Sequence, residues 1–261
     1  VESWGSSMAF GTLTNFGDTD AYAAREGVRF AVIGSGRVAD LPQTVGSNPD
    51  VYDLCSSDLG AFDPGQMLPV PIVAIDVGPV TCADDSSLIG TGDCSNTLQR
   101  QFMPPGASQS VPANDYTELR FTTQVPAGTK SLSYDFAFMS FEYPGFWQSS
   151  YNDMFIAWLE SDTWTGNISF DNGGNALSLK AAFMEHFDDA GDLPEFEGTC
   201  MRYSAGTGWL ESSIAVEEGD EITLVFAIFD VDDVNWDSIV FVDNFNWSCD
   251  GDGPPTTIPV D

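Results

Sequence analysis

Residues 131–160 read SLSYDFAFMSFEYPGFWQSSYNDMFIAWLE and contain the strongest β pattern of the chain. In the first half every second side chain is large and apolar, namely Leu132, Tyr134, Phe136 and Phe138. An alternation of period two is typical of a strand with one buried face. Residues 154–159 are apolar on both faces and predict a central strand. Between the two, Pro144 and Gly145 predict a type II turn.

Oxygen-bearing side chains lie beside this predicted core. Carboxylate and amide oxygens are the ligands that Ca²⁺ prefers, so we expect a Ca²⁺ site either in the connection between the two strands or in the acidic segment 230–243. The alternative is that these acids only keep the protein soluble. Segment 230–243 lacks the sixth-position Gly and the terminal Glu of an EF-hand, which excludes that motif. The candidate ligands are Glu142, Asn152 and Asp153 in the connection, and Asp230, Asp232, Asp233, Asp237 and Asp243 in the acidic segment.

The same stretches resemble a known family. The pattern F-x-S-x-E-Y-P-x-F at residues 138–146, followed by Y-N-D-x-F at 151–155, resembles the choice-of-anchor L domain of secreted and surface-attached bacterial proteins. Residues 219–244 are similar to the closing strands of that family, and residues 26–41 resemble its N-terminal segment. The resemblance covers most of residues 26–246 and implies a fold and a location rather than an activity.

The rest of the chain consists of many short β-like runs separated by turns, without a sustained helical pattern. We therefore predict an all-β protein, a jelly-roll-like antiparallel β-sandwich with long loops and extended termini. The expected division is an N-terminal extended arm or first strand at 1–25, a β-sandwich domain at 26–248, and a Pro/Thr-rich C-terminal tail at 249–261. A chain of 261 residues can bury a sizeable core.

The charge of the chain limits its partners. Its 8 Lys and Arg against 40 Asp and Glu give a net charge of −32, which opposes binding to nucleic acid and to anionic membranes. No apolar run is long enough to predict direct membrane insertion. The first residue is Val1 rather than Met, which is consistent with an exported protein whose signal peptide has been removed and equally with a shortened chain. We expect an extracellular or cell-surface location.

Five cysteines are spaced too irregularly for a zinc site, and no C-x-x-C is present. Disulfides in an oxidising compartment are the better interpretation. The first expected bridge joins Cys82 to Cys94, which flank a polar loop, and the second joins Cys200 to Cys249. Cys55 is then either buried and free or bonded to another chain.

An active site is not evident in the sequence. The single histidine, His186, lies in an acidic segment with no G-x-S-x-G or comparable nucleophile motif nearby. The E-x-D-x-x-E strand pattern of jelly-roll glucanases is also missing. We expect a solvated loop histidine and a protein that is not an enzyme.

These observations favour a non-enzymatic secreted or cell-surface structural or adhesive protein that associates with itself into an extracellular fibre or matrix with Ca²⁺ support. Apolar residues in extended terminal segments are typical of strands that pair with a neighbour's sheet, although a tail that folds back on its own sandwich is the simpler alternative. The alternative function is a Ca²⁺-dependent carbohydrate-binding module, with an extracellular glycan as partner and stacking by Tyr143, Trp147 and Trp236. The candidate assembly residues are Val1, Trp4, Phe10, Thr257, Ile258 and Val260.

Overall fold

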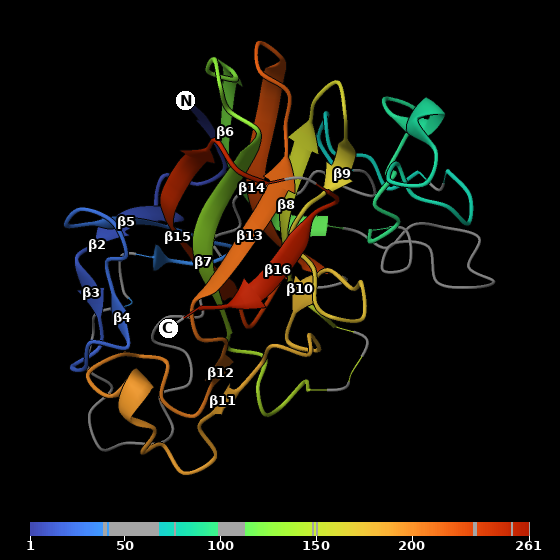
Figure 1. The fold of residues 1–261 in the computed structure, drawn as a ribbon. Coiled ribbons are helices and arrows are strands. Elements are labelled where there is room, and N and C mark those ends of the chain that lie inside the picture. The colour runs from blue at the N-terminus through green and yellow to red at the C-terminus, as the bar shows by residue number, and fades with distance from the viewer. Residues whose placement is uncertain are drawn as a thin grey trace.

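The computed structural model describes residues 1–38, 41, 68–75, 77–98, 113–147, 149, 151–231, 234–251 and 253–260. Within these ranges the chain forms two large antiparallel sheets that pack as a sandwich, a small two-stranded sheet, and short 3-10 helices at Ser86–Leu88 and Pro194–Phe196 (Figure 1). The predicted all-β antiparallel sandwich is confirmed. None of the helices in the described part of the chain is long and apolar enough to cross a membrane.

The first large sheet has the strand order β1–β6–β14–β8–β10, with β9 also paired to β8. β14 lies at its centre and pairs antiparallel with β6 on one side and β8 on the other. Its strands are β1 (Glu2–Trp4), β6 (Ala113–Gln124), β8 (Met154–Glu160), β9 (Thr165–Asn167), β10 (Leu177–Ser178) and β14 (Glu221–Val231).

The second large sheet has the order β11–β12–β7–β15–β5–β2, with β13 beside β7 and β16 beside β13. The small sheet pairs β3 (Asn15–Phe16) with β4 (Tyr22–Ala23). The strands of the second sheet are β2 (Phe10–Leu13), β5 (Phe30–Gly34), β7 (Ser131–Ser140), β11 (His186–Phe187), β12 (Ala205–Gly206), β13 (Leu210–Ala215), β15 (Ser238–Ser248) and β16 (Thr256–Pro259).

The core has a central layer between the two sheets and a further layer on each outer face. The central layer contains the predicted inner face of β7, namely Leu132, Tyr134, Phe136 and Phe138. One face of β8 joins this layer, whereas Met154, Ile156 and Trp158 pack on the outer face of the first sheet with Ile72 and Leu98. Loop residues therefore cover β8 from outside, which explains why it is apolar on both faces.

The two strands of the opening stretch lie in different sheets. The connection after β7 leaves the second sheet and enters the first at β8. The predicted type II turn is wrong, because Gly145 does not have the positive φ that this turn requires. Instead, the N–H of Phe146 donates to the carbonyl oxygen of Glu142 at 2.7 Å.

Both ends of the chain pair with strands of the same chain. β1 pairs with β6, and β16 runs antiparallel to β13 from Ser213↔Thr256 to Leu210↔Pro259. The segment expected to be a tail outside the sandwich thus supplies an outer strand of the second sheet. Among the candidate assembly residues Thr257 is buried, Phe10 and Val260 are partly buried, and Val1, Trp4 and Ile258 are exposed.

The cysteines follow the prediction only in part. Cys82 and Cys94 form the expected disulfide, with their Cα atoms 5.2 Å apart. The predicted Cys200–Cys249 bridge is wrong, because Cys249 is free and exposed whereas Cys200 is disulfide-bonded. The partner of Cys200 is therefore not among the other described cysteines. Cys55 lies outside the described residues.

Candidate metal centre

Buried acidic side chains gather where strands of both large sheets end. Glu142 comes just after β7, Asp153 just before β8 and Asp237 just before β15. Asp115 lies near the start of β6, and Asp230 near the end of β14. None of these five side chains is more than 4% exposed. Carboxylates are rarely buried unless they are paired or hold a metal, so this concentration points to a site.

Asp115, Asp230 and Asp237 form the tightest part of this centre. Each offers one carboxylate oxygen, and these three oxygens lie within 4.8 Å of one another. The register of β6 against β14 shifts between Ile228 and Asp230, where β6 has one extra residue. Asp115 lies in this bulge with a φ of 45°. Bulges re-aim the side chains of a strand, which accounts for the position of Asp115 beside Asp230.

Asp153 links the connection after β7 to the acidic centre. Its N–H donates to Glu142 Oε2 at 3.1 Å, and its Oδ2 accepts a hydrogen bond from Ser238 Oγ at 2.6 Å. The other carboxylate oxygen, Oδ1, is buried and has no hydrogen-bond partner among the described residues, and the same holds for Oδ1 of Asn152. Asp153 therefore has a buried acceptor without a donor, and so does the preceding residue, Asn152.

The surroundings of Asp153 oppose its ionisation. Burial raises the pKa of this carboxyl well above its usual value, and the nearby carboxylates of Asp230 and Glu142 raise it further. The hydrogen bond from Ser238 lowers the pKa, but not enough to compensate. In the absence of a cation, burial and the neighbouring carboxylates therefore favour the protonated form of Asp153.

Asp171 shows how the same chain accommodates a buried carboxylate without a cation. Its removal from water raises its pKa, but hydrogen bonds from backbone N–H groups outweigh that effect and leave the pKa below its usual value. Donors to its two oxygens are the N–H groups of Gly173, Asn175 and Ala182. Asp153 has a hydrogen bond from Ser238 Oγ, but the carboxylates of Asp230 and Glu142 lie close to it and raise its pKa.

One glycine makes room for the centre. Gly36 follows β5, and a Cβ atom built on it would overlap the carboxylate of Asp237. The neighbouring Ser35 holds this segment to β15, since its N–H donates to the carbonyl oxygen of Ser238 at 3.0 Å and its Oγ accepts from the N–H of Ser238 at 2.9 Å. Close approach of backbone to a side chain is a common reason for glycine.

The donor set suits Ca²⁺ better than other metal ions. Ca²⁺ takes six to eight oxygen ligands in flexible geometry, and the centre offers several buried carboxylates. Zinc prefers nitrogen and sulfur, and no His or Cys belongs to the cluster of the described residues. A divalent cation would supply the positive charge that offsets burial of these groups.

The structure unites two places that the sequence analysis kept apart. Glu142, Asn152 and Asp153 lie at the same end of the sandwich as Asp230 and Asp237. Asp243 does not join them, because its Oδ2 accepts hydrogen bonds from the backbone N–H groups of Arg25 and Glu26, at 2.7 and 3.1 Å. Asp232 and Asp233 lie outside the described residues. Asp115 was not predicted, since only the pairing of β6 with β14 reveals that it meets Asp230.

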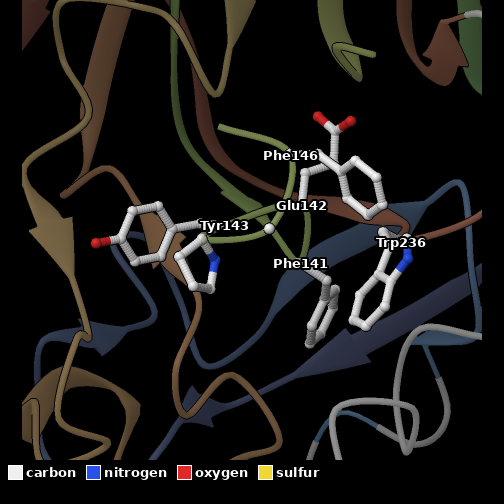
Figure 2. Close-up of a pocket in the computed structure, with 7 residues that line it drawn as sticks. Phe141, Glu142, Tyr143, Phe146 and Trp236 are labelled. Carbon is white, nitrogen blue, oxygen red and sulfur yellow. The ribbon is translucent and has the colours of Figure 1, made fainter. Parts of the chain in front are cut away.

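An apolar pocket of about 210 Å³ lies beside the centre (Figure 2). Its lining includes the rings of Phe141, Tyr143, Phe146 and Trp236, and Glu142 is its one charged residue among those described. Figure 2 shows the carboxylate of Glu142 pointing away from the rings of Phe141 and Trp236. This pocket therefore offers little to the hydroxyl groups of a sugar. Trp147 lies outside the lining and packs against Tyr143 and Phe187.

His186 has a different environment from the solvated loop that we expected. It lies in the short strand β11, is partly buried, and its Nδ1 lies 2.7 Å from the hydroxyl oxygen of Tyr22. That hydroxyl donates to the carbonyl oxygen of Thr207 at 2.7 Å. His186 thus has a structural contact in the second sheet.

Comparison with known proteins agrees with the sequence motifs. The model of the choice-of-anchor L domain matches residues 76–246, so the weaker resemblance of residues 26–41 lies outside the match. No curated protein and no solved structure gives a significant match. The family is one of bacterial surface or secreted proteins and is not an enzyme family, which implies an extracellular or surface location. Because the match spans more than half of the chain, this protein belongs to the choice-of-anchor L domain family.

Proposed function

We propose that this chain is a non-enzymatic structural module of an extracellular or surface protein, and that a bound Ca²⁺ ion holds one end of its sandwich together. The observation that carries the proposal is the buried acidic centre, in which Oδ1 of Asp153 has no hydrogen-bond partner among the described residues. A cation at this place contacts the ends of strands from both sheets at once. The bound cation therefore cross-links the two sheets.

Calorimetric titration tests the proposal directly. Protein stripped with EDTA and dialysed is expected to bind one Ca²⁺ ion, and Asp153→Asn to bind it at least about tenfold more weakly, because the variant loses a charged ligand. Glu221→Gln is the matched control: Glu221 begins β14, the strand that carries Asp230 near its other end, and is exposed. Absence of binding heat in the intact protein, or equal affinity in Asp153→Asn, contradicts the proposal.

A second part of the proposal is that copies of this module associate through the outer strand β16. Its support is the position of β16 at the C-terminal end of the described chain, with Ile258 52% exposed. The segment before it contains Gly251 and Gly253, both with positive φ, and such a connection permits a change of direction. Exchange of β16 between copies would preserve its pairing with β13 while linking two molecules.

Sedimentation velocity tests this association. The intact protein in Ca²⁺ is expected to form oligomers, and deletion of residues 249–261 to leave monomers. Ile258→Thr keeps the strand but removes exposed apolar surface, and we expect it to weaken assembly without unfolding the module. Val28→Thr is the control, because Val28 is 76% exposed and lies outside every strand. Intact and truncated protein that sediment alike as monomers would refute assembly through β16.

A further inference from the structure

Strand β16 lies at an edge of the second sheet, where it pairs with β13 alone among the described strands (Figure 1). Thr257 is buried in this position, at 6% exposure, whereas Thr256 and Ile258 on either side of it are exposed. One polar side chain of this outer strand is thus turned toward the interior. Buried polar groups of folded proteins are almost always hydrogen-bonded, so the partners of Thr257 show what this position requires.

The hydroxyl of Thr257 ends a chain of buried hydroxyl groups. Its Oγ1 lies 2.8 Å from Oγ of Ser212 on β13, and that oxygen lies 2.9 Å from Oγ of Ser169. The hydroxyl of Tyr134 on β7 also contacts Oγ of Ser169. Tyr134, Ser212 and Thr257 lie opposite one another on three adjacent strands. The chain of hydroxyls therefore runs from the central layer of the core to β16.

A backbone donor completes the contacts of Thr257. The N–H of Phe170 donates to its Oγ1 at 3.2 Å, so the hydroxyl hydrogen remains for the contact with Ser212. A hydroxyl is a small group that accepts and donates at one atom. Valine has the shape of threonine but can do neither, and it would leave the N–H of Phe170 and Oγ of Ser212 each short of one buried partner.

We propose that the slot beside β13 is a strand-binding site that selects a threonine or serine hydroxyl at the position of Thr257. The inference rests on the proposed association through β16, because it names what the arriving strand of a second copy must present. A main-chain ladder gives affinity for any extended segment, whereas a buried side-chain contact discriminates between segments. Polar groups that a wrong strand leaves unpaired are an effective means of rejecting it.

The charge of the segment also suits binding to a second copy. Residues 253–260 read GPPTTIPV and contain no charged side chain, in a chain whose net charge is −32. This segment can therefore approach another copy with less repulsion than the acidic parts of the chain. The partner that fits the slot is an uncharged extended segment with an inward hydroxyl, and the C-terminal segment of a second copy has both properties.

Covalent capture of a peptide tests the inference on the intact chain. Side-chain oxygens of Ser213 and Thr256 lie 3.0 Å apart on opposite residues of β13 and β16, at the surface. The receiving protein is therefore Ser213→Cys in a Cys249→Ser background, which removes the free thiol. The ligand is a synthetic peptide of residues 250–261 with Thr256→Cys, in large excess. A disulfide forms in a thiol redox buffer when the peptide replaces β16, and mass spectrometry measures its yield.

The yield is expected to depend on position 257 of the peptide. A peptide that also has Thr257→Val is expected to be captured about tenfold less than the parent peptide, because it leaves buried polar groups unpaired. Thr257→Ser keeps the hydroxyl and is expected to be captured to a similar extent as the parent. Glu221→Cys in the same background is the control protein, since Glu221 is exposed on β14 in the other large sheet and should capture all three peptides equally and weakly.

Each outcome decides a different point. Capture of the threonine and serine peptides with about tenfold loss for valine supports the inference. Equal capture of all three at Ser213→Cys, or no capture above that of Glu221→Cys, overturns it. The association itself is decided by sedimentation of the intact protein: selective capture by a protein that sediments as a monomer would support the strand site and refute the association.

Discussion

Ca²⁺ is expected to raise the melting temperature of the EDTA-stripped protein by about 5–10 °C. A ligand that binds only the native state at a hundredfold excess over its Kd stabilises it by about 2.7 kcal/mol. For a chain of this size each kcal/mol corresponds to about 2–4 °C. The ion replaces the water that Asp153 loses on burial and offsets its repulsion by Asp230 and Glu142. Differential scanning calorimetry in EDTA and in CaCl₂, at equal ionic strength, measures the difference.

The stabilisation of the folded protein by Ca²⁺ is expected to depend on pH. The pKa of Asp153 is raised in the folded state, so without Ca²⁺ this group makes folding less favourable as the pH rises from its ordinary pKa through its folded-state pKa. Ca²⁺ competes with the proton, and its stabilising effect is therefore larger at pH 8 than at pH 5. In Asp153→Asn the stability in EDTA should depend less on pH, and the response to Ca²⁺ should shrink. A melting temperature that is identical in EDTA and CaCl₂ at pH 8 would show that the acids hold no ion.

Removal of the Cys82–Cys94 disulfide is expected to lower the free energy of unfolding by about 3 kcal/mol. The bridge closes a segment that is almost without regular structure, apart from the 3-10 helix at Ser86–Leu88. This segment supports β9, because the N–H of Cys94 donates to the carbonyl oxygen of Thr165 at 2.9 Å. Urea denaturation of the Cys82→Ser, Cys94→Ser double variant measures the loss.

Cys249→Ser is the control for this experiment, since Cys249 is free and exposed and its substitution should leave the urea midpoint unchanged. The double variant is preferable to a reducing agent, which would also break the disulfide of Cys200. A double variant as stable as the intact protein would mean that the hydrogen bonds of residues 77–98 hold the segment without the bridge.

Local patterns allowed part of this fold to be predicted. The inner face of β7 and the double burial of β8 follow from the spacing of apolar residues, which depends only on near neighbours. The same pattern says which face of a strand is buried but not which strand lies beside it. β7 pairs with β15 and β8 pairs with β14, and both partners lie far along the sequence, so the placement of the two strands in different sheets was not predictable.

The residues of the candidate metal centre likewise fall into those that the sequence predicts and those that it does not. Glu142, Asn152 and Asp153 could be named because oxygen-bearing side chains at the ends of buried strands are a local signal. That these residues lie close to Asp230, and that a bulge in β6 brings Asp115 beside it, depends on the register of distant strands. The same holds for the disulfides. The pairing of Cys82 with Cys94, which are separated by a short loop, was predicted, whereas the pairing of Cys200 was not.

The strand order of the two sheets also determines when the chain can fold. β6 and β8 are joined only by β14, which lies between them, and β7 and β5 are joined only by β15. Neither sheet can be completed before residues 221–248 have been synthesised, although β7 can already pair with β12 and β13, and β8 with β9 and β10. Pairings between distant segments form slowly, because a long loop must close before any contact is gained. Both sheets are therefore completed only when the last strands arrive, which is compatible with passage of an unfolded polypeptide through a translocation channel.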